Sequence, residues 1–348
     1  MHRDAIAPAY IFNRTQNTLI METKDTGLHW SRQKEQAAGY WHIKLLLILF
    51  RFFPKIILRI LAFPVGFFYY VFSKKAKAES KRFLRKAASR ISNPGTAKKC
   101  LSPLGSLRHI ISFALALVEK IESWGGKFNF ENVRFCDDDI SQLIRDLNNE
   151  RGVFLITSHL GNIDLLRGLV SFDRTGVSRK VPVTAVIDIK TSQNFNRMIK
   201  ELNPQSDFDI INPGEIGPHT AVLLEEKLKQ GGIVTIAGDR TSAKGAERNF
   251  LVNFLGEKAP FSPGAFYMAV LLKAPVYFVF GLRRKIFSLK PEYDMHVHKS
   301  ALSMENTKKE RLNLASNLAE SFARHLEGYC KEQPFQWYNF FDFWSNEV

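Results

Sequence analysis

His159 is the residue whose surroundings best suit acid–base chemistry. It lies two residues after the apolar run 153–157, and Gly161-Asn162 then leads into a segment that begins with Ile163 and Asp164. A histidine at the end of a buried strand lies where sheets with alternating strands and helices place their ligand sites. A carboxylate five residues later can reach one imidazole nitrogen and leave the other to accept a proton. The spacing favours a histidine base oriented by Asp164.

The same residues also have a purely structural interpretation, which stays open at this point. Asn162 suits the N-cap of a following helix, and an acidic residue such as Asp164 is favoured in a first helical turn. A capped helix with a polar first turn therefore explains the pattern without any catalysis.

Other chemistries lack their residue patterns in this chain. It has no Gly-x-Ser-x-Gly, no glycine-rich phosphate loop followed by Lys-Ser/Thr, and no Gly-x-Gly-x-x-Gly after a strand. No His/Cys/Asp cluster has metal-ligand spacing, so no metal is expected. Ser158 precedes His159, and adjacent strand residues point to opposite faces. A base without a protein nucleophile is expected to activate a hydroxyl on a substrate.

The elements that position these residues alternate between strands and helices from about residue 106. Apolar stripes predict helices over 107–123, 140–149, 221–229 and 263–272. Apolar runs predict strands over 152–157, 181–187, 233–237 and 276–280. This alternation indicates an α/β fold for residues 106–348, with a mixed, largely parallel sheet flanked by helices.

Residues 1–105 are expected to form a separate, membrane-associating helical region. Residues 1–110 hold 20 Lys/Arg and 5 Asp/Glu, and this surplus of 15 equals the net charge of the whole chain. The apolar stretch 45–72 is interrupted by Arg51, Lys55 and Arg59 at four-residue spacing. This pattern favours a helix or hairpin in a membrane interface, with its cations near lipid phosphates. A true span remains an alternative, and a core helix is disfavoured because unpaired cations are costly there.

The partner of this basic region is expected to be anionic lipid. Nucleic acid is the rival, since phosphate contacts alone explain a run of lysines and arginines. The chain shows no zinc-finger spacing, basic heptad region or RNP-like motif, so no nucleic-acid partner is expected. Three widely spaced cysteines indicate a reducing compartment. A monomer is the default expectation.

Several short motifs occur in an order that resembles one family. The segment VFLITSHLGNIDLLRGLV (153–170) resembles the His-x4-acid motif of the lysophospholipid acyltransferase superfamily. The ordered set is closest to the bacterial lipid A biosynthesis (late) acyltransferase-like branch, although the acid there is usually Glu. The further matching motifs are GIVTIAGDR (232–240), FLG (254–256), PGA (263–265), APV (274–276) and QPFQWYNFFDFW (333–344).

The resemblance implies an O-acyltransferase on the cytoplasmic face of a bacterial inner membrane. His159 would be the general base and Asp164 its orienting partner. A hydroxyl of a lipid or glycolipid would attack the thioester of an acyl carrier protein or coenzyme A, without an acyl-enzyme. This thioester is a co-substrate, and no cofactor is expected. The competing hypothesis is a non-catalytic membrane- or nucleic-acid-binding protein on an acyltransferase-like scaffold.

The substrate-binding residues expected from this resemblance are Gly161, Asn162, Asp239, Arg240 and Arg197. Asp239 and Arg240 follow another predicted strand and can reach the same cleft. Arg240 suits a phosphate or a developing oxyanion, with a simple ion pair as the alternative. The arginine-containing block that the family carries after the histidine motif has no clear match here, and Arg197 is what this region offers. The aromatic residues in 337–344 either cap the sheet or touch lipid.

Overall fold

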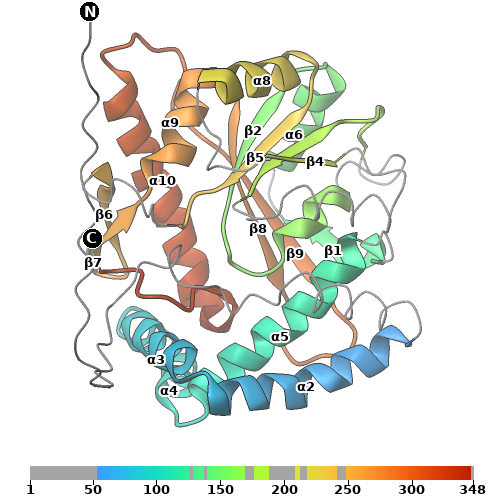
Figure 1. Ribbon diagram of the computed structural model, residues 1–348, viewed down its shortest axis with the longest axis vertical. Helices are drawn as coiled ribbons and strands as arrows, with labels where there is room; N and C mark the ends of the chain where they lie inside the picture. Colours follow the sequence, from blue (N-terminus) through green and yellow to red (C-terminus); the bar gives the residue numbers. More distant parts are fainter. Residues whose placement is uncertain are drawn as a thin grey trace, which may run out of the picture.

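A seven-stranded sheet runs through the middle of the molecule (Figure 1). The computed structural model describes residues 53–124, 128–136, 139–168, 176–187, 208–211, 218–240 and 248–345. The strands are β1 (Val133–Phe135), β2 (Val153–Thr157), β3 (Val183–Val186), β4 (Phe208–Ile211), β5 (Ile233–Ala237), β8 (Val276–Arg283) and β9 (Tyr293–Lys299). They follow the order β1-β9-β8-β2-β5-β3-β4, and neighbours are parallel except β8 and β9. The prediction of a mixed, largely parallel sheet flanked by helices is confirmed.

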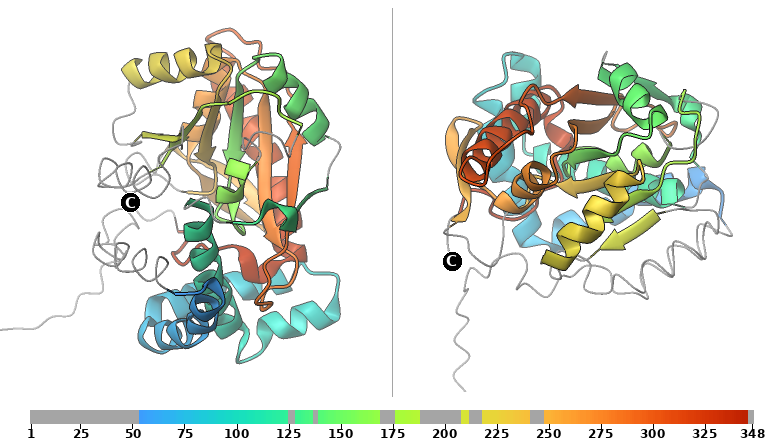
Figure 2. Two further views of the ribbon diagram at one scale, coloured as in Figure 1. Left: turned by 90° about the vertical axis from the view of Figure 1, so that its right-hand side faces the viewer. Right: turned by 90° about the horizontal axis from the view of Figure 1, so that it is seen from above.

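Helices cover both faces of this sheet (Figure 2). Phe154 and Ile156 of β2 belong to a core shared with α8 (Pro218–Lys229), α9 (Pro263–Leu272) and α10 (Arg311–Glu332). Val153 and Leu155 belong to a second core on the other face, where α6 (Asp139–Asn148) packs. All five residues of β2 are buried, which is why the strand is an unbroken apolar run in the sequence.

A hairpin outside the sheet completes the larger core, the one that contains Phe154 and Ile156 of β2. Its strands are β6 (Phe250–Phe254) and β7 (Glu257–Phe261), and they pair antiparallel. Phe254 and Phe261 are fully buried beside α10. Both rings also approach the aromatic segment near the end of the described chain, since Phe254 lies 5.3 Å from Trp337 between ring centroids. The hairpin therefore packs against that C-terminal aromatic segment.

The N-terminal helices lie together beneath the sheet, at the end where β2 and β5 finish (Figures 1 and 2). They are α2 (Lys55–Phe72), α3 (Lys74–Ala88), α4 (Pro94–Leu101) and α5 (Gly105–Trp124). Leu58 and Ala62 of α2 pack on Leu115 and Val118 of α5. A Cβ at Gly66 of α2 would lie 3.1 Å from Ile111 Cα, so α2 and α5 touch closely there. These helices are packed onto the rest of the molecule.

Arg59 departs from the expectation for the N-terminal cations. Its Nη2 donates to both Oε atoms of Glu122 at 2.6 Å, and its Nη1 donates to the Leu289 carbonyl at 3.0 Å. Only 11% of its side chain is exposed. The prediction that Arg59 faces lipid phosphate is wrong, because α5 supplies a counter-charge that the sequence pattern did not reveal. Arg51 lies outside the described residues.

The face of α2 turned away from α5 is apolar and exposed. Among the described helices, α2 is the single continuous one long and apolar enough to cross a membrane, and 22% of it is buried. The next helix, α3, is strongly basic and its Phe83 and Leu84 are buried in the larger core. The large exposed side chains on α2 are Ile56, Ile57, Ile60, Leu61, Val65, Phe67, Phe68, Tyr69, Val71 and Phe72.

Candidate active site

The carboxyl ends of β2 and β5 bring His159 and Asp239 together. The two strands are parallel neighbours, with Thr157 opposite Ala237. Two residues further along each chain, His159 Nδ1 lies 2.8 Å from Asp239 Oδ1. The His159 backbone N–H donates to Asp239 Oδ2, also at 2.8 Å. The Asp239 side chain is fully buried, whereas 29% of the His159 side chain is exposed, so the pair has one accessible end.

Gly238 allows the strand ends to stay this close. Its backbone N–H donates to the Thr157 carbonyl at 2.8 Å and continues the pairing one residue past the strand. A Cβ at this position would lie 2.8 Å from Ile156 Cγ2 and 3.0 Å from Phe322 Cε1. Both atoms belong to fully buried side chains, so a larger residue would push the Asp239 backbone away from β2.

Asp164 lies elsewhere, and the structure gives the imidazole a different carboxylate from the predicted one. Asp164 Oδ2 is 3.2 Å from Lys120 Nζ on α5, and the Asp164 carbonyl accepts from Ser123 Oγ at 2.9 Å. The 3₁₀ helix η2 (Ile163–Gly168) turns this residue toward α5. Strand register instead delivers Asp239, which is 80 residues from His159 in the sequence. The prediction that Asp164 contacts the imidazole is therefore corrected, because the carboxylate beside Nδ1 is that of Asp239.

The charges around His159 favour a neutral ring beside an ionised carboxylate. Burial, followed by the charge of Arg240, lowers the pKa of His159, and Asp239 offsets part of this shift. Burial alone would raise the pKa of Asp239, but its electrostatic interaction and hydrogen bonds with His159, together with the charge of Arg240, outweigh this effect and hold the pKa below its usual value. A neutral ring next to a carboxylate carries its proton on Nδ1, so Nε2 keeps a lone pair.

Arg240 contacts that lone pair. Its Nε donates to His159 Nε2 at 3.2 Å. Its guanidinium lies over the Phe341 ring, 5.0 Å from the centroid, a cation–π distance. The structure thus brings Arg240 to His159, as its position after β5 suggests. Arg197, the other arginine expected at the site, lies outside the described residues.

Gly161 and Asn162 shape the turn that follows His159. Gly161 has φ of +68°, and a Cβ there would lie 1.8 Å from the Gly281 carbonyl oxygen, so the crossing requires glycine. Asn162 N donates to that same carbonyl at 2.8 Å, and Asn162 Oδ1 accepts from the Asp164 backbone N–H at 3.2 Å. Asn162 caps a 3₁₀ turn where the sequence suggested an α-helix. A role for either residue in substrate binding stays a prediction.

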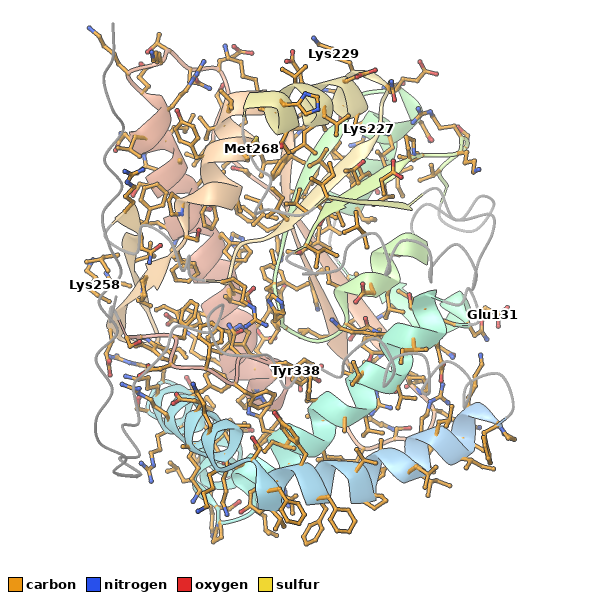
Figure 3. The ribbon with its side chains drawn as sticks, in the orientation of Figure 1. Glu131, Lys227, Lys229, Lys258, Met268 and Tyr338 are labelled. Carbon is orange, nitrogen blue, oxygen red and sulfur yellow. The ribbon has the colours of Figure 1, made fainter. Side chains whose placement is uncertain are left out.

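Residues of the C-terminal segment donate hydrogen bonds to both Asp239 and His159. Trp337 Nε1 donates to Asp239 Oδ2 at 2.8 Å, and Asn339 Nδ2 donates to the Asp239 carbonyl at 3.1 Å. Tyr338 N donates to the His159 carbonyl at 2.9 Å. Tyr338 lies where the lower end of the sheet meets α5 (Figure 3). The sequence motif 333–344 contains these residues, but the sequence alone did not connect it to His159.

Ser158, which precedes His159, lacks the exposure that a nucleophile needs. It is buried, and its Oγ accepts from the Leu160 backbone N–H at 3.3 Å.

No group of three or more His, Cys, Asp or Glu side chains within the described ranges is arranged to hold a metal ion. The geometry of His159, with Nδ1 fixed and Nε2 basic, suits a general base acting on a hydroxyl that a substrate brings.

Comparison with protein families places this geometry in a known context. The model of the family described as bacterial lipid A biosynthesis acyltransferase matches residues 112–345. The chain belongs to this family. A search of curated proteins finds no match to the chain. The matched region of this lipid A acyltransferase family member runs from within α5 through the C-terminal segment, and it contains His159, Asp239 and Trp337. Membership indicates an acyltransferase.

Proposed function

We propose that this protein transfers a fatty acyl group from an acyl thioester to a hydroxyl of a lipid or glycolipid. The observation that carries the proposal is the contact of 2.8 Å between His159 Nδ1 and Asp239 Oδ1 at the open end of two parallel strands. This contact fixes the tautomer in which Nε2 is the base, and the buried carboxylate stabilises the imidazolium that forms. Family membership supports acyl transfer as the chemistry.

The proposed reaction proceeds without a covalent enzyme intermediate. The acceptor hydroxyl replaces Arg240 on His159 Nε2 and gives up its proton there as its oxygen attacks the thioester carbonyl. The carbon–sulfur bond then breaks, and the thiolate of the acyl carrier protein or coenzyme A takes the proton back from the imidazolium. The displaced Arg240 guanidinium stays close enough to face the developing oxyanion or a phosphate of the acceptor.

The direct test is the variant His159→Ala, assayed for transfer of a labelled acyl group into lipid. We expect activity to fall by about 10²- to 10⁴-fold, because a general base contributes that much. His219→Ala is the control, since His219 is an exposed histidine on α8. Both variants should fold and bind vesicles like the wild type. Near-normal transfer by His159→Ala would refute the mechanism, and release of free fatty acid instead of a new ester would indicate a hydrolase.

We also propose that the enzyme works at the cytoplasmic face of a bacterial inner membrane, with α2 lying in the lipid interface. Phe68 and Phe72 are 59% and 77% exposed on the apolar face of α2. The basic helix α3 follows directly, with Lys74, Lys75 and Lys81 exposed. An apolar face beside a cluster of cations fits a surface of anionic lipid.

Vesicle flotation tests this second proposal. Phe68→Asp combined with Phe72→Asp should abolish flotation with vesicles that contain anionic lipid, because each charge would enter the apolar layer. Val222→Asp is the matched control, since Val222 is 63% exposed on α8 at the opposite end of the molecule (Figure 1). Unchanged flotation of the double variant would contradict the proposal. Salt-sensitive binding to nucleic acid without flotation would favour the non-catalytic alternative.

A further inference from the structure

Two donors fix the rotation of the Asp239 carboxylate. Oδ2 accepts from the His159 backbone N–H and from Trp337 Nε1, each at 2.8 Å. With Oδ2 engaged twice, Oδ1 is the atom left to face His159 Nδ1. Among the described residues, the indole N–H thus donates the one hydrogen bond to this carboxylate that does not come from His159 itself.

Trp337 is itself held rigidly. Its side chain is fully buried, with the rings of Phe83 and Phe343 4.8 Å and 5.1 Å away between centroids. Its carbonyl accepts from His109 Nε2 at 2.8 Å, and His109 Nδ1 contacts Ser80 Oγ at 3.0 Å. Because a carbonyl can only accept, His109 carries its proton on Nε2 and accepts from Ser80. Helices α3 and α5 therefore clamp the residue that contacts the carboxylate.

We propose that Trp337 is a positioning residue of the acyl transfer: its indole N–H holds Asp239 in the rotation that presents Oδ1 to His159. This inference rests on the proposed function, since it assigns Trp337 a role in the same general-base step. The segment 336–341 then belongs to the catalytic apparatus, in addition to closing the core. Trp337 cannot touch substrate, because it lies fully buried behind Asp239.

Loss of the indole N–H has two predictable consequences. The carboxylate becomes freer to rotate, so fewer molecules hold the productive geometry and kcat falls. The carboxylate charge is also less neutralised, so it stabilises the His159 imidazolium more strongly and raises the pKa of the ring. The acidic limb of the pH–rate profile should therefore move to higher pH. KM for donor and acceptor should stay unchanged, since no substrate contact is lost.

The experiment compares Trp337→Phe with Trp344→Phe. Both remove an indole from the same aromatic cluster, where the two tryptophan rings are 6.1 Å apart between centroids. Trp344 Nε1 is buried and has no hydrogen-bond partner in the described part of the chain, so replacing this indole removes ring contacts, including one with Lys86, but no hydrogen bond. We expect Trp337→Phe to lower kcat by roughly 10- to 100-fold, the value of a hydrogen bond to a charged group. Trp344→Phe should change neither kcat nor the pH profile by more than about 2-fold.

Two further measurements keep the proposal testable if Trp337→Phe folds poorly. Benzothienylalanine at position 337 replaces the N–H with sulfur and keeps the ring size, so it should reproduce the fall in kcat. NMR titration of ¹³C-labelled His159 needs no substrate, and it should show a raised pKa for Trp337→Phe and the wild-type value for Trp344→Phe. Unchanged kcat and titration after loss of the N–H would overturn the proposal, as would equal shifts in both variants. If the wild type transfers no acyl group, the proposed function fails, and the titration still tests the contact.

Discussion

Two of the buried charged pairs in the described part of the chain differ in how open they are to solvent. In the first, His159 and Asp239 meet at the ends of β2 and β5, and the ring keeps one accessible edge. In the second, Arg283 Nη2 donates to Glu119 Oε1 at 2.8 Å between β8 and α5, and Tyr293 donates to the other oxygen. Here the side chains of Arg283 and Glu119 are only 2% and 0% exposed. The Arg283–Glu119 pair, the closed cluster, is sealed from solvent and ties α5 to the sheet. The His159–Asp239 pair, the open cluster, has one exposed edge, where the imidazole can exchange Arg240 for another partner.

The largest effect should come from breaking the open cluster at its carboxylate. Asp239→Asn keeps the shape but offers Nδ1 an amide, which favours the wrong tautomer, so activity should fall by about 10³- to 10⁴-fold. Asp164→Asn should cost less than about 10-fold, because Asp164 pairs with Lys120, while Asp239 and Arg240 contact the two ring nitrogens. Acyl-transfer rates of the two purified variants decide this. A greater loss from Asp164→Asn would restore the assignment made from sequence spacing.

Breaking the closed cluster should affect stability and leave the chemistry intact. Glu119→Gln leaves the Arg283 guanidinium buried without its counter-charge, so the free energy of unfolding should fall by about 3–5 kcal/mol. Glu305→Gln is the control, since Glu305 is 83% exposed in its pair with Lys273 and should change stability by less than about 0.5 kcal/mol. Urea denaturation gives both values. If folded Glu119→Gln lost acyl transfer as severely as Asp239→Asn, the two clusters would not be functionally distinct.

A smaller effect should appear in the pH dependence of stability through His109. Burial lowers the pKa of His109 from 6.5 to about 4. The unfolded chain therefore binds more protons than the folded one between these values. The resulting stabilisation is complete above about pH 6.5 and is lost as the pH falls toward 4, by about 3 kcal/mol in all. His109→Gln should flatten this part of the curve in urea titrations at pH 4 and 7. An identical pH slope in both proteins would contradict the assignment.

The sequence predicts the strands, and the position of His159 at the end of one of them, because these signals are local. Residues 153–157 and 233–237 are apolar runs, and both are strands with the expected polar residues at their ends. The partner of His159 is not a local property. Asp164 is five residues away and Asp239 is 80, and only the pairing of β2 with β5 decides between them. Reasoning from the sequence alone therefore favours Asp164, the carboxylate nearer to His159 along the chain.

The same limit explains the misassigned cation and the missed tryptophan. Arg59 resembles a lipid-facing residue until Glu122, 63 positions later, is brought against it by the packing of α2 on α5. Trp337 resembles a core or interface aromatic until its N–H is seen to meet Asp239, 98 positions earlier. In both cases the type of residue was informative, but the chemistry depended on a contact between distant segments. The apolar face of α2 was local and therefore predictable.

The distance along the chain between His159, Asp239 and Trp337 also affects synthesis. A ribosome delivers the base first, its carboxylate 80 residues later and the indole a further 98 residues on. Loops of that length close slowly, because their entropy is lost before the contacts form. A nascent polypeptide that has passed β5 already contains both residues of the pair, yet the carboxylate lacks its third donor. Translation must proceed beyond residue 337 before the three segments can assemble.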